Sequence, residues 1–509
     1  MPKPANLEQT LDAMKAAQAS AMQNTDLTKS FTQPGSATTG LQAYDLEGPS
    51  KKFYPVETPL RNSIPRITGG YAIQANWKVI TNINVQNQRA GVGEGQRGGK
   101  IQHQTDDYFA SFRGFGLEND VTFEANYASK NYEDVKALAV AQTLEATMIQ
   151  EERLILGGNT SLAMGQTPTP VLAAVANGGT LTAATKSIIC IALGLQAYLD
   201  VVGMNNGGIG QIFDAAFAQV PGQIVRTNAD GSTSTFGGGS ARKSAAATVT
   251  VVNGGSITAT VTPVNGAVGY AWYMGPAGSE RLITVTAINS VIIKDEPQGG
   301  AQLASSIADQ DNSTSSYDFD GLLIQALKPN SKAYVKYMPT GTAGVGTKLT
   351  SDGAGGVVEI NEALYAFYTR YRLSPDVIYV SAQELQDIST LIVGNNGAPL
   401  LQLTVDVNDP SSIVAGKVVG SYLNKITNTK VEIKVHPNMP TGTIFFFTRK
   451  LPYQLANVAN TVQMKMRQDY YQIEWPLRTR KYEYGVYADG VLQHYAPFSM
   501  GVITNIARQ

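Results

Sequence analysis

The stretch FRGFGLENDVTFEANYASKNYEDVKALAVAQTLEATMIQEERLILGG occupies residues 112–158. Its second half predicts one long helix over 131–156, because apolar residues recur there at helical spacing. The apolar stripe consists of Ala137, Val140, Leu144, Met148 and Ile155. Asn131 is expected to cap the helix, and the pair Gly157-Gly158 to end it.

Two adjacent carboxylates, Glu151 and Glu152, lie near the end of this predicted helix. Paired carboxylates are candidates for acid–base catalysis, but the surrounding sequence holds no histidine and no metal-ligand spacing. We therefore expect these residues to lie on a solvated face or to form an ion pair with another subunit.

A long β-hairpin is predicted immediately before this stretch. Residues 77–87 and 108–112 alternate apolar and polar side chains, and the segment between them is GVGEGQRGGK (91–100). An isolated two-stranded hairpin is only marginally stable in water, so this one must pack on another surface, which includes the surface of another subunit. The glycines allow its tip to bend.

A nucleotide-binding loop is the alternative interpretation of these glycines, and the sequence disfavours it. In a phosphate-binding loop ending at Lys100, Glu94 stands where the first glycine belongs, and Ile101 replaces the hydroxyl residue. A G-x-G-x-x-G match begins at Gly93, but no helical pattern follows it. We expect a mobile loop, no bound cofactor and no enzymatic activity.

The composition excludes several classes of protein. The chain has 509 residues, 16% of them charged, and a net charge of −1, so it has no basic excess for holding nucleic acid. The single cysteine, Cys190, lies in an apolar run and is expected to be a buried, inert thiol. The histidines are far apart, which disfavours zinc. With no membrane-length apolar run and no signal peptide, the sequence predicts a soluble protein made in the cytosol.

Further along the chain, residues 167–298 differ in composition from their surroundings. Short Thr- and Val-rich segments alternate there with turn signals, which predicts an inserted β-sandwich. Residues 204–240 are interpreted as loop. Ile257, Ala259 and Val261 are expected to face the sandwich core, with Trp272 filling it.

After residue 298 the host domain resumes as a mixture of helices and strands. Helices are predicted over 319–327 and 359–372, followed by a buried strand over 376–381. Ser381 and Glu384 form a capping box for the next helix. Strands then dominate, and in one of them Val462, Met464 and Met466 alternate with polar residues, so one face is expected to be buried. The fold class is therefore α+β.

Three blocks, 112–158, 318–327 together with 359–392, and 438–506, resemble the major capsid proteins of tailed bacteriophages, the Hong Kong 97-like fold. The segment 167–298 resembles the immunoglobulin- or fibronectin-like inserts of some of these proteins. The resemblance divides the chain, from its beginning to its end, into these parts: N-terminal arm 1–60, extended loop and start of the peripheral domain 61–130, spine helix 131–166, inserted sandwich 167–298, axial domain 299–435, and peripheral strands 436–509.

The function implied by this resemblance is assembly. Hexamers and pentamers of the chain would form an icosahedral virion shell in the host cytoplasm and enclose double-stranded DNA without gripping it. The implied partners are further copies of the chain, a portal protein, a separate scaffolding protein and a decoration protein, with no membrane. Some family members crosslink a loop lysine to an asparagine of a neighbour; in this chain Lys100 with Asn457 or Asn460 is the corresponding alternative.

The residues expected at contacts between subunits are charged residues of the loop, the helix and a late turn: Arg89, Glu94, Arg97, Lys100, Glu151, Glu152, Arg478 and Arg480. Two rival functions stay open. The sandwich alone would suit a sugar-binding adhesin or tail component, and the glycine loop would suit an enzyme.

Overall fold

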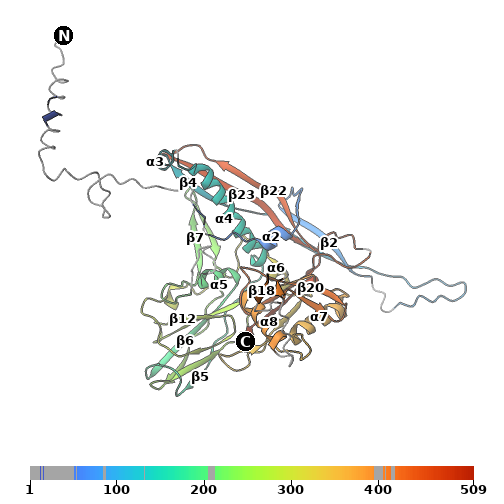
Figure 1. Cartoon of the computed structure of the whole chain (residues 1–509). Helices are drawn as coiled ribbons and strands as arrows, with labels where there is room; N and C mark the ends of the chain where they lie inside the picture. The colour runs from blue at the N-terminus through green and yellow to red at the C-terminus, as the bar shows by residue number, and fades with distance from the viewer. Residues whose placement is uncertain are drawn as a thin grey trace, which may run out of the picture. The chain divides into compact units, whose positions relative to one another are not determined.

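The computed structural model describes residues 12, 15–16, 51–52, 54–83, 88–130, 132–203, 213–394, 405–406, 409–413, 419–454 and 456–509 (Figure 1). They fall into two compact units, Met1–Lys52 with Ser129–Glu133, and Phe53–Ala128 with Asp134–Gln509. The second unit is α+β, as predicted, and is described below. Most of the predicted arm, 1–60, lies outside the described residues.

A four-stranded sheet carries the long strands of the chain. Its order is β1 (Arg66–Thr68), β22 (Val462–Glu474), β23 (Lys481–His494) and β4 (Arg113–Thr122). β23 is antiparallel to both neighbours, and β1 is parallel to β22. The predicted alternation in β22 is confirmed, since Val462, Met464 and Met466 are buried.

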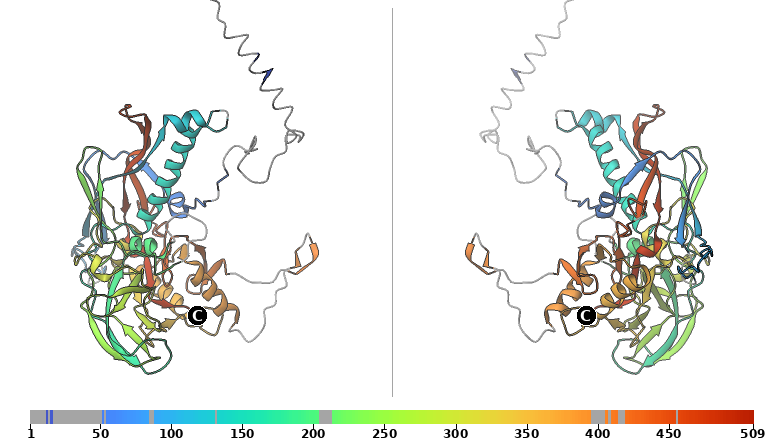
Figure 2. Two further views of the ribbon diagram at one scale, coloured as in Figure 1. Left: turned by 90° about the vertical axis from the view of Figure 1, so that its left-hand side faces the viewer. Right: turned by 90° about the vertical axis from the view of Figure 1, so that its right-hand side faces the viewer.

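Helix α4 (Val135–Gly157) packs on β4 and β23 of this sheet (Figures 1 and 2). The predicted cap is wrong, because the helix begins after Asp134, whose Oδ1 accepts hydrogen bonds from the backbone N–H of Lys136 and Ala137. Asn131 lies outside the described residues. The predicted end is confirmed at Gly157.

The predicted apolar stripe of α4 is confirmed only in part, since Ile155 is buried and Val140 packs against a small buried cluster. The buried line includes Ala139, Thr143 and Thr147, whereas Ala137 is exposed. Threonines are tolerated inside because each hydroxyl donates to the carbonyl one turn earlier, Thr143 to Ala139 O at 2.7 Å and Thr147 to Thr143 O at 2.8 Å. At the end of the helix, a Cβ on Gly157 would lie 2.3 Å from Leu195 Cδ2, so close packing requires glycine there.

A six-stranded sheet forms the centre of the second half. Its order is β14 (Tyr334–Tyr337), β24 (Gly501–Thr504), β21 (Ile444–Phe447), β16 (Val377–Val380), β20 (Thr429–Val435) and β19 (Ser421–Asn424). It is buried on both faces: Tyr379 and Phe445 belong to the core shared with the long sheet, while Ile378 and Phe446 belong to a second core. Helix α7 (Val358–Tyr371) contributes Ile360, Leu364 and Phe367 to that second core, as predicted.

Ser381 caps the start of α8 (Ala382–Gly394) as predicted, but the capping box is only partly formed, because Glu384 accepts from the Ser381 hydroxyl and from Gly442 N. Ser381 Oγ accepts from the backbone N–H of Gln383 at 3.2 Å and donates to Glu384 Oε2. The predicted helix over 319–327 is shorter, α6 (Leu322–Leu327).

Two further sheets lie within residues 171–293 and face each other across one core. One sheet has the order β13 (Ser290–Ile293), β10 (Ser256–Thr260), β5 (Val171–Val175), and the other β12 (Arg281–Thr286), β11 (Gly269–Gly275), β6 (Ala184–Leu193), β9 (Ala247–Val251). The core between them holds the predicted inward residues Ile257, Ala259, Val261 and Trp272. Cys190 is also buried there, and burial raises the pKa of its thiol well above the ordinary value.

The larger of these sheets is buried on both faces. Along β6, Ile188 and Cys190 point into the sandwich core, while Ile189 and Ile191 belong to the main core of the chain. Along β11, Trp272 and its neighbour Tyr273 divide in the same way. This pair of sheets is therefore not an appended module, because the sheet of β12, β11, β6 and β9 packs against both the core between the two sheets and the main core of the chain.

One element in this region contradicts the prediction. Within the stretch interpreted as loop, β7 (Gln223–Thr227) and β8 (Thr233–Gly237) form an antiparallel hairpin, in which Phe236 stacks against Tyr317 with ring centroids 4.7 Å apart.

The remaining elements are short, apart from the β2–β3 hairpin: α2 (Pro59–Ser63), β2 (Gln74–Asn82), β3 (Gln104–Ser111), α3 (Phe123–Ala128), α5 (Leu195–Val202), η2 (Ala304–Ser306), β15 (Thr347–Lys348), β17 (Val405–Asp406), β18 (Asp409–Ile413), η3 (Pro497–Ser499) and β25 (Ile506–Ala507). Among the described residues, no helix is both long and apolar enough to cross a membrane.

Candidate assembly surface

The predicted hairpin is confirmed as the antiparallel pair β2–β3, with Trp77 opposite Tyr108 and Gln74 opposite Ser111. One face of its root packs on the main core of the same chain through Ala75 and Trp77. The stacked Trp77 and Tyr108 rings, with centroids 6.0 Å apart, fix that packing. The root is therefore rigidly attached to its own subunit, and the tip can reach away from it.

Large apolar side chains are exposed on and beside this hairpin. Tyr71 is 94% exposed, Ile73 83%, Phe109 70% and Ile80 64%. Single exposed apolar residues are ordinary, but a cluster along one ribbon is typical of a surface that another molecule covers. The hairpin is thus the strongest candidate for a protein–protein interface.

The segment entering the hairpin is tied to helix α4 through buried charges. Both oxygens of Glu152 accept hydrogen bonds from backbone, Oε1 from Leu60 N at 2.8 Å and Oε2 from Arg61 N at 2.6 Å. His436 Nε2 lies 2.7 Å from the same Oε1. Because His436 Nδ1 accepts from Asn438 N, the neutral ring carries its proton on Nε2 and donates it to Glu152.

Glu151 completes this cluster on the neighbouring side of the helix. It accepts from Arg61 Nε at 2.9 Å, from Arg66 Nη1 at 2.5 Å and from the hydroxyl of Tyr470. Arg66 also binds Asp469 through two nitrogens. Burial lowers the pKa of Arg66, but the hydrogen bonds and charges of Asp469 and Glu151 outweigh it and raise the pKa above its ordinary value.

The interpretation of Glu151 and Glu152 as a solvated face is therefore wrong. Both side chains are 0% exposed, and the partners found for them belong to the same chain. In this conformation neither is accessible to a second subunit. The physical role of the pair is to hold residues 58–66 against α4, which the helical spacing of the sequence alone did not reveal.

The other predicted contact residues are on the surface. Arg89, Glu94, Arg97 and Lys100 are exposed in the segment between β2 and β3. Arg478 and Arg480 are exposed in the turn between β22 and β23, where Arg480 pairs with Glu124 at 2.7 Å. Their exposure does not test the predicted contacts between subunits, which stay predictions.

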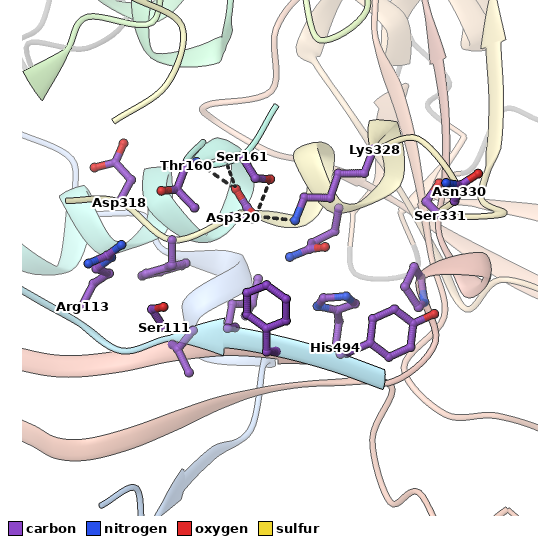
Figure 3. A pocket seen from close by; sticks show the side chains of 18 of the residues that line it. Ser111, Arg113, Thr160, Ser161, Asp318, Asp320, Lys328, Asn330, Ser331 and His494 are labelled. Carbon is purple, nitrogen blue, oxygen red and sulfur yellow. Dashed lines mark hydrogen bonds and ion pairs between the residues drawn. The ribbon is translucent and has the colours of Figure 1, made fainter. Parts of the chain in front are cut away.

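A cavity of about 320 Å³ lies beside β3 (Figure 3). Figure 3 shows Ser111 and His494 on one side of it and Ser161, Asp320 and Lys328 on the other. Asp320 is saturated, since it accepts from the backbone N–H groups of Thr160 and Ser161, from the Ser161 hydroxyl and from Lys328. Ser161 thus donates to a carboxylate whose charge Lys328 and two backbone N–H groups already compensate.

His494 is neutral in this cavity, because burial lowers its pKa to about 3. Its ring packs edge-on against Trp77, with centroids 5.5 Å apart. Among the described residues, no group of histidine, cysteine, aspartate and glutamate side chains has the arrangement of a metal site.

Asp318, also in the cavity lining, gives a pH-dependent prediction. Burial raises its pKa from an ordinary 3.8 to about 6, against the opposing charge of Arg113. A carboxyl group with a raised folded-state pKa favours folding at low pH and loses that contribution as pH rises through about 6. Asp318→Asn should therefore stabilise the protein by about 1 to 3 kcal/mol at pH 8 and not at pH 4.

Chemical unfolding of wild type and Asp318→Asn at both pH values measures this difference. Asp309→Asn is the control of opposite sign, because the hydrogen bond from Arg242 lowers the pKa of Asp309. An equal effect of Asp318→Asn at pH 4 and pH 8 would contradict the assignment.

Comparisons with known proteins give weak likenesses. No family model matches the chain, and no curated protein matches it. Similar solved structures include the capsid of Myoviridae phage XM1 (9% identity, 93% of this chain and 100% of that chain, TM-score 0.38) and Gordonia phage Cozz (8%, 94% and 99%, TM-score 0.42). Another is the holo-SrpI encapsulin complex from Synechococcus elongatus (8%, 90% and 93%, TM-score 0.35). At identities and TM-scores this low, the likeness by itself establishes nothing about function.

Proposed function

We propose that the chain is a non-enzymatic structural subunit that assembles with copies of itself into a closed shell, and more specifically that it is the major capsid protein of a tailed phage with a Hong Kong 97-like fold. The observation that carries the proposal is the β2–β3 hairpin. Its root is anchored in its own core, while Tyr71, Ile73 and Phe109 are exposed at 70% or more. Such a ribbon gains stability only when a neighbour covers it.

The arrangement of the other elements supports the same proposal. A long helix, α4, runs along a sheet built from the segment after the hairpin and the end of the chain. A separate six-stranded sheet with α7 and α8 follows, which is proposed as the centre of the axial domain although it also takes β21 and β24 from the segment 436–509. In this proposal, residues 1–60 are the arm, 131–166 the spine helix, 299–435 the axial domain and 436–509 the peripheral strands, with 167–298 as an immunoglobulin-like insertion.

Assembly would use heterologous contacts, because a hairpin on one subunit meets a different surface on the next. Rings of five and six subunits then close into an icosahedral shell around double-stranded DNA. The proposed partners are further copies of the chain, a portal protein, a separate scaffolding protein and a decoration protein. Arg89, Glu94, Arg97, Lys100, Arg478 and Arg480 are proposed contacts between subunits.

Electron microscopy of the purified full-length chain tests the proposal. We expect repeating assemblies such as rings, sheets or shells, and a single monomeric species at every concentration would contradict it. An adhesin would instead bind glycans as an isolated protein, and an enzyme using the glycine loop would be stabilised by nucleotides.

A shortened hairpin provides a sharper prediction. Replacing residues 83–103 by Asn-Gly keeps every pair of the β2–β3 ladder, up to the last pair of Asn82 and Gln104. The replacement should therefore leave the fold intact. We expect at least about tenfold fewer assembled particles by sedimentation, because the segment beyond the paired strands, with the proposed contacts Arg89, Glu94, Arg97 and Lys100, is gone. The matched control replaces residues 228–232 by Asn-Gly between the paired Thr227 and Thr233, and should assemble normally. Equal assembly of both variants would contradict the role of the hairpin.

A further inference from the structure

The cavity beside β3 contains a buried polar atom that the chain itself does not satisfy. His494 is 5% exposed, and its Nδ1 finds no hydrogen-bond partner in the part of the chain that the structure describes. The side chain of Gln325, which can both donate and accept hydrogen bonds, lines the same cavity. A buried polar atom without a partner costs free energy, so this cavity is suited to a polar occupant.

The strand that borders this cavity has an open edge. The bond from Phe112 N to Ile73 O, 3.0 Å, fixes the alternation of the β2–β3 ladder. It follows that Asp107, Phe109 and Ser111 occupy the pairs that are not hydrogen bonded, so their backbone N–H and C=O groups point away from β2. All three residues line the cavity, and none of these backbone groups has a partner among the described ranges.

We infer that this edge and cavity form one docking site for an extended segment of a second copy of the chain. The segment adds a strand to β3 and inserts a polar side chain between His494 and Gln325. Unpaired backbone groups recognise extended backbone, which a small ligand does not offer, and the adjoining cavity selects one side chain. The inference rests on the proposed function and goes beyond it by placing the site on this edge of the hairpin.

The second copy, and not an unrelated protein, is the occupant for a physical reason. Phe109 belongs both to the cavity rim and to the exposed apolar ribbon, so the site continues the proposed assembly surface. An open strand edge next to exposed apolar side chains invites aggregation unless a partner is always present. For a chain that assembles with itself, its own copies are that partner.

Two proline variants of the full-length chain test the two outer edges of the hairpin, one on β3 and one on β2, for their separate contributions to assembly. Asp107 and Lys78 lie opposite each other in a pair that is not hydrogen bonded, so each has its N–H on a different outer edge. Asp107→Pro blocks the β3 edge and Lys78→Pro blocks the β2 edge, and both lose the same exposed ion pair. We expect Asp107→Pro to reduce assembled particles by about tenfold or more and Lys78→Pro to leave them near wild type. Equal behaviour of the two variants would overturn the inference.

A crosslink identifies the occupant. Particles carrying Phe109→p-benzoylphenylalanine are irradiated, and mass spectrometry of the crosslinked dimer should show a peptide of a second copy joined to position 109. The same substitution at Phe217, which is 81% exposed elsewhere, is the control and should yield no such dimer. Normal particles without a crosslink at position 109, or with a crosslink to another protein, overturn the inference and leave the proposed function standing. A chain that never assembles overturns both.

Discussion

Replacing Glu152 by alanine should lower the free energy of unfolding by about 3 to 5 kcal/mol. The carboxylate is 0% exposed and accepts from three N–H groups, those of Leu60, Arg61 and His436. Alanine leaves all three donors buried without an acceptor and opens a void at the contact between α4 and α2. Chemical denaturation of the unassembled subunit measures the loss, and trypsin cleavage after Arg61 should become faster because its segment is released.

Two further variants show that the buried geometry, and not charge alone, causes this loss. Glu152→Gln keeps the shape and one acceptor oxygen, so its cost should fall between alanine and wild type. Glu124→Ala removes a carboxylate that is 62% exposed and paired with Arg480, and should change stability by no more than about 0.5 kcal/mol. If Glu152→Ala and Glu124→Ala cost the same, the buried cluster does not hold the segment.

Trp272→Ala is the second change with a large expected effect, about 3 to 5 kcal/mol. The indole is 0% exposed in the sandwich core, and its Nε1 donates to Thr286 Oγ1 at 2.8 Å. Because neighbouring residues of β11 also pack in the main core, the variant should lower the unfolding midpoint of the whole unit. A separate early transition, followed by an unchanged main one, would show that the sandwich unfolds independently.

A matched tryptophan provides the control for this experiment. Trp475 is partly exposed and stacks on Tyr487 with ring centroids 6.1 Å apart. Trp475→Ala should cost about 1 kcal/mol, mostly the value of that aromatic pair. Trp272→Phe keeps most of the buried volume and loses the hydrogen bond to Thr286, so about 1 to 2 kcal/mol is expected.

Local patterns predicted the elements whose periodicity reflects a single buried face. The strand with Met464 and Met466 and the helix with Ile360 and Phe367 were predictable for that reason. The cap at Ser381 was predictable because its spacing is local. The hairpin followed from two alternating runs around a glycine-rich segment.

The features that could not be predicted depend on contacts between residues that lie far apart in the sequence. The stripe of α4 was only partly correct because its threonines satisfy their hydroxyls on the helix backbone, and because its buried glutamates find arginine, histidine and tyrosine partners from segments up to 319 residues away. No helical pattern contains that information. The β7–β8 hairpin was missed because its strands are short and mostly exposed, although the Asp230-Gly231 turn between them was a local signal.

The sheet shared by two cores constrains how this gene can be rearranged. Excising residues 167–298 as a cassette would remove from the main core the buried side chains that β6 and β11 contribute to it, such as Ile189, Ile191 and Tyr273. Exposed turns such as 276–279 carry no such cost and can be lengthened more readily. The region 167–298 therefore cannot be exchanged as a unit without loss of stability in the rest of the chain.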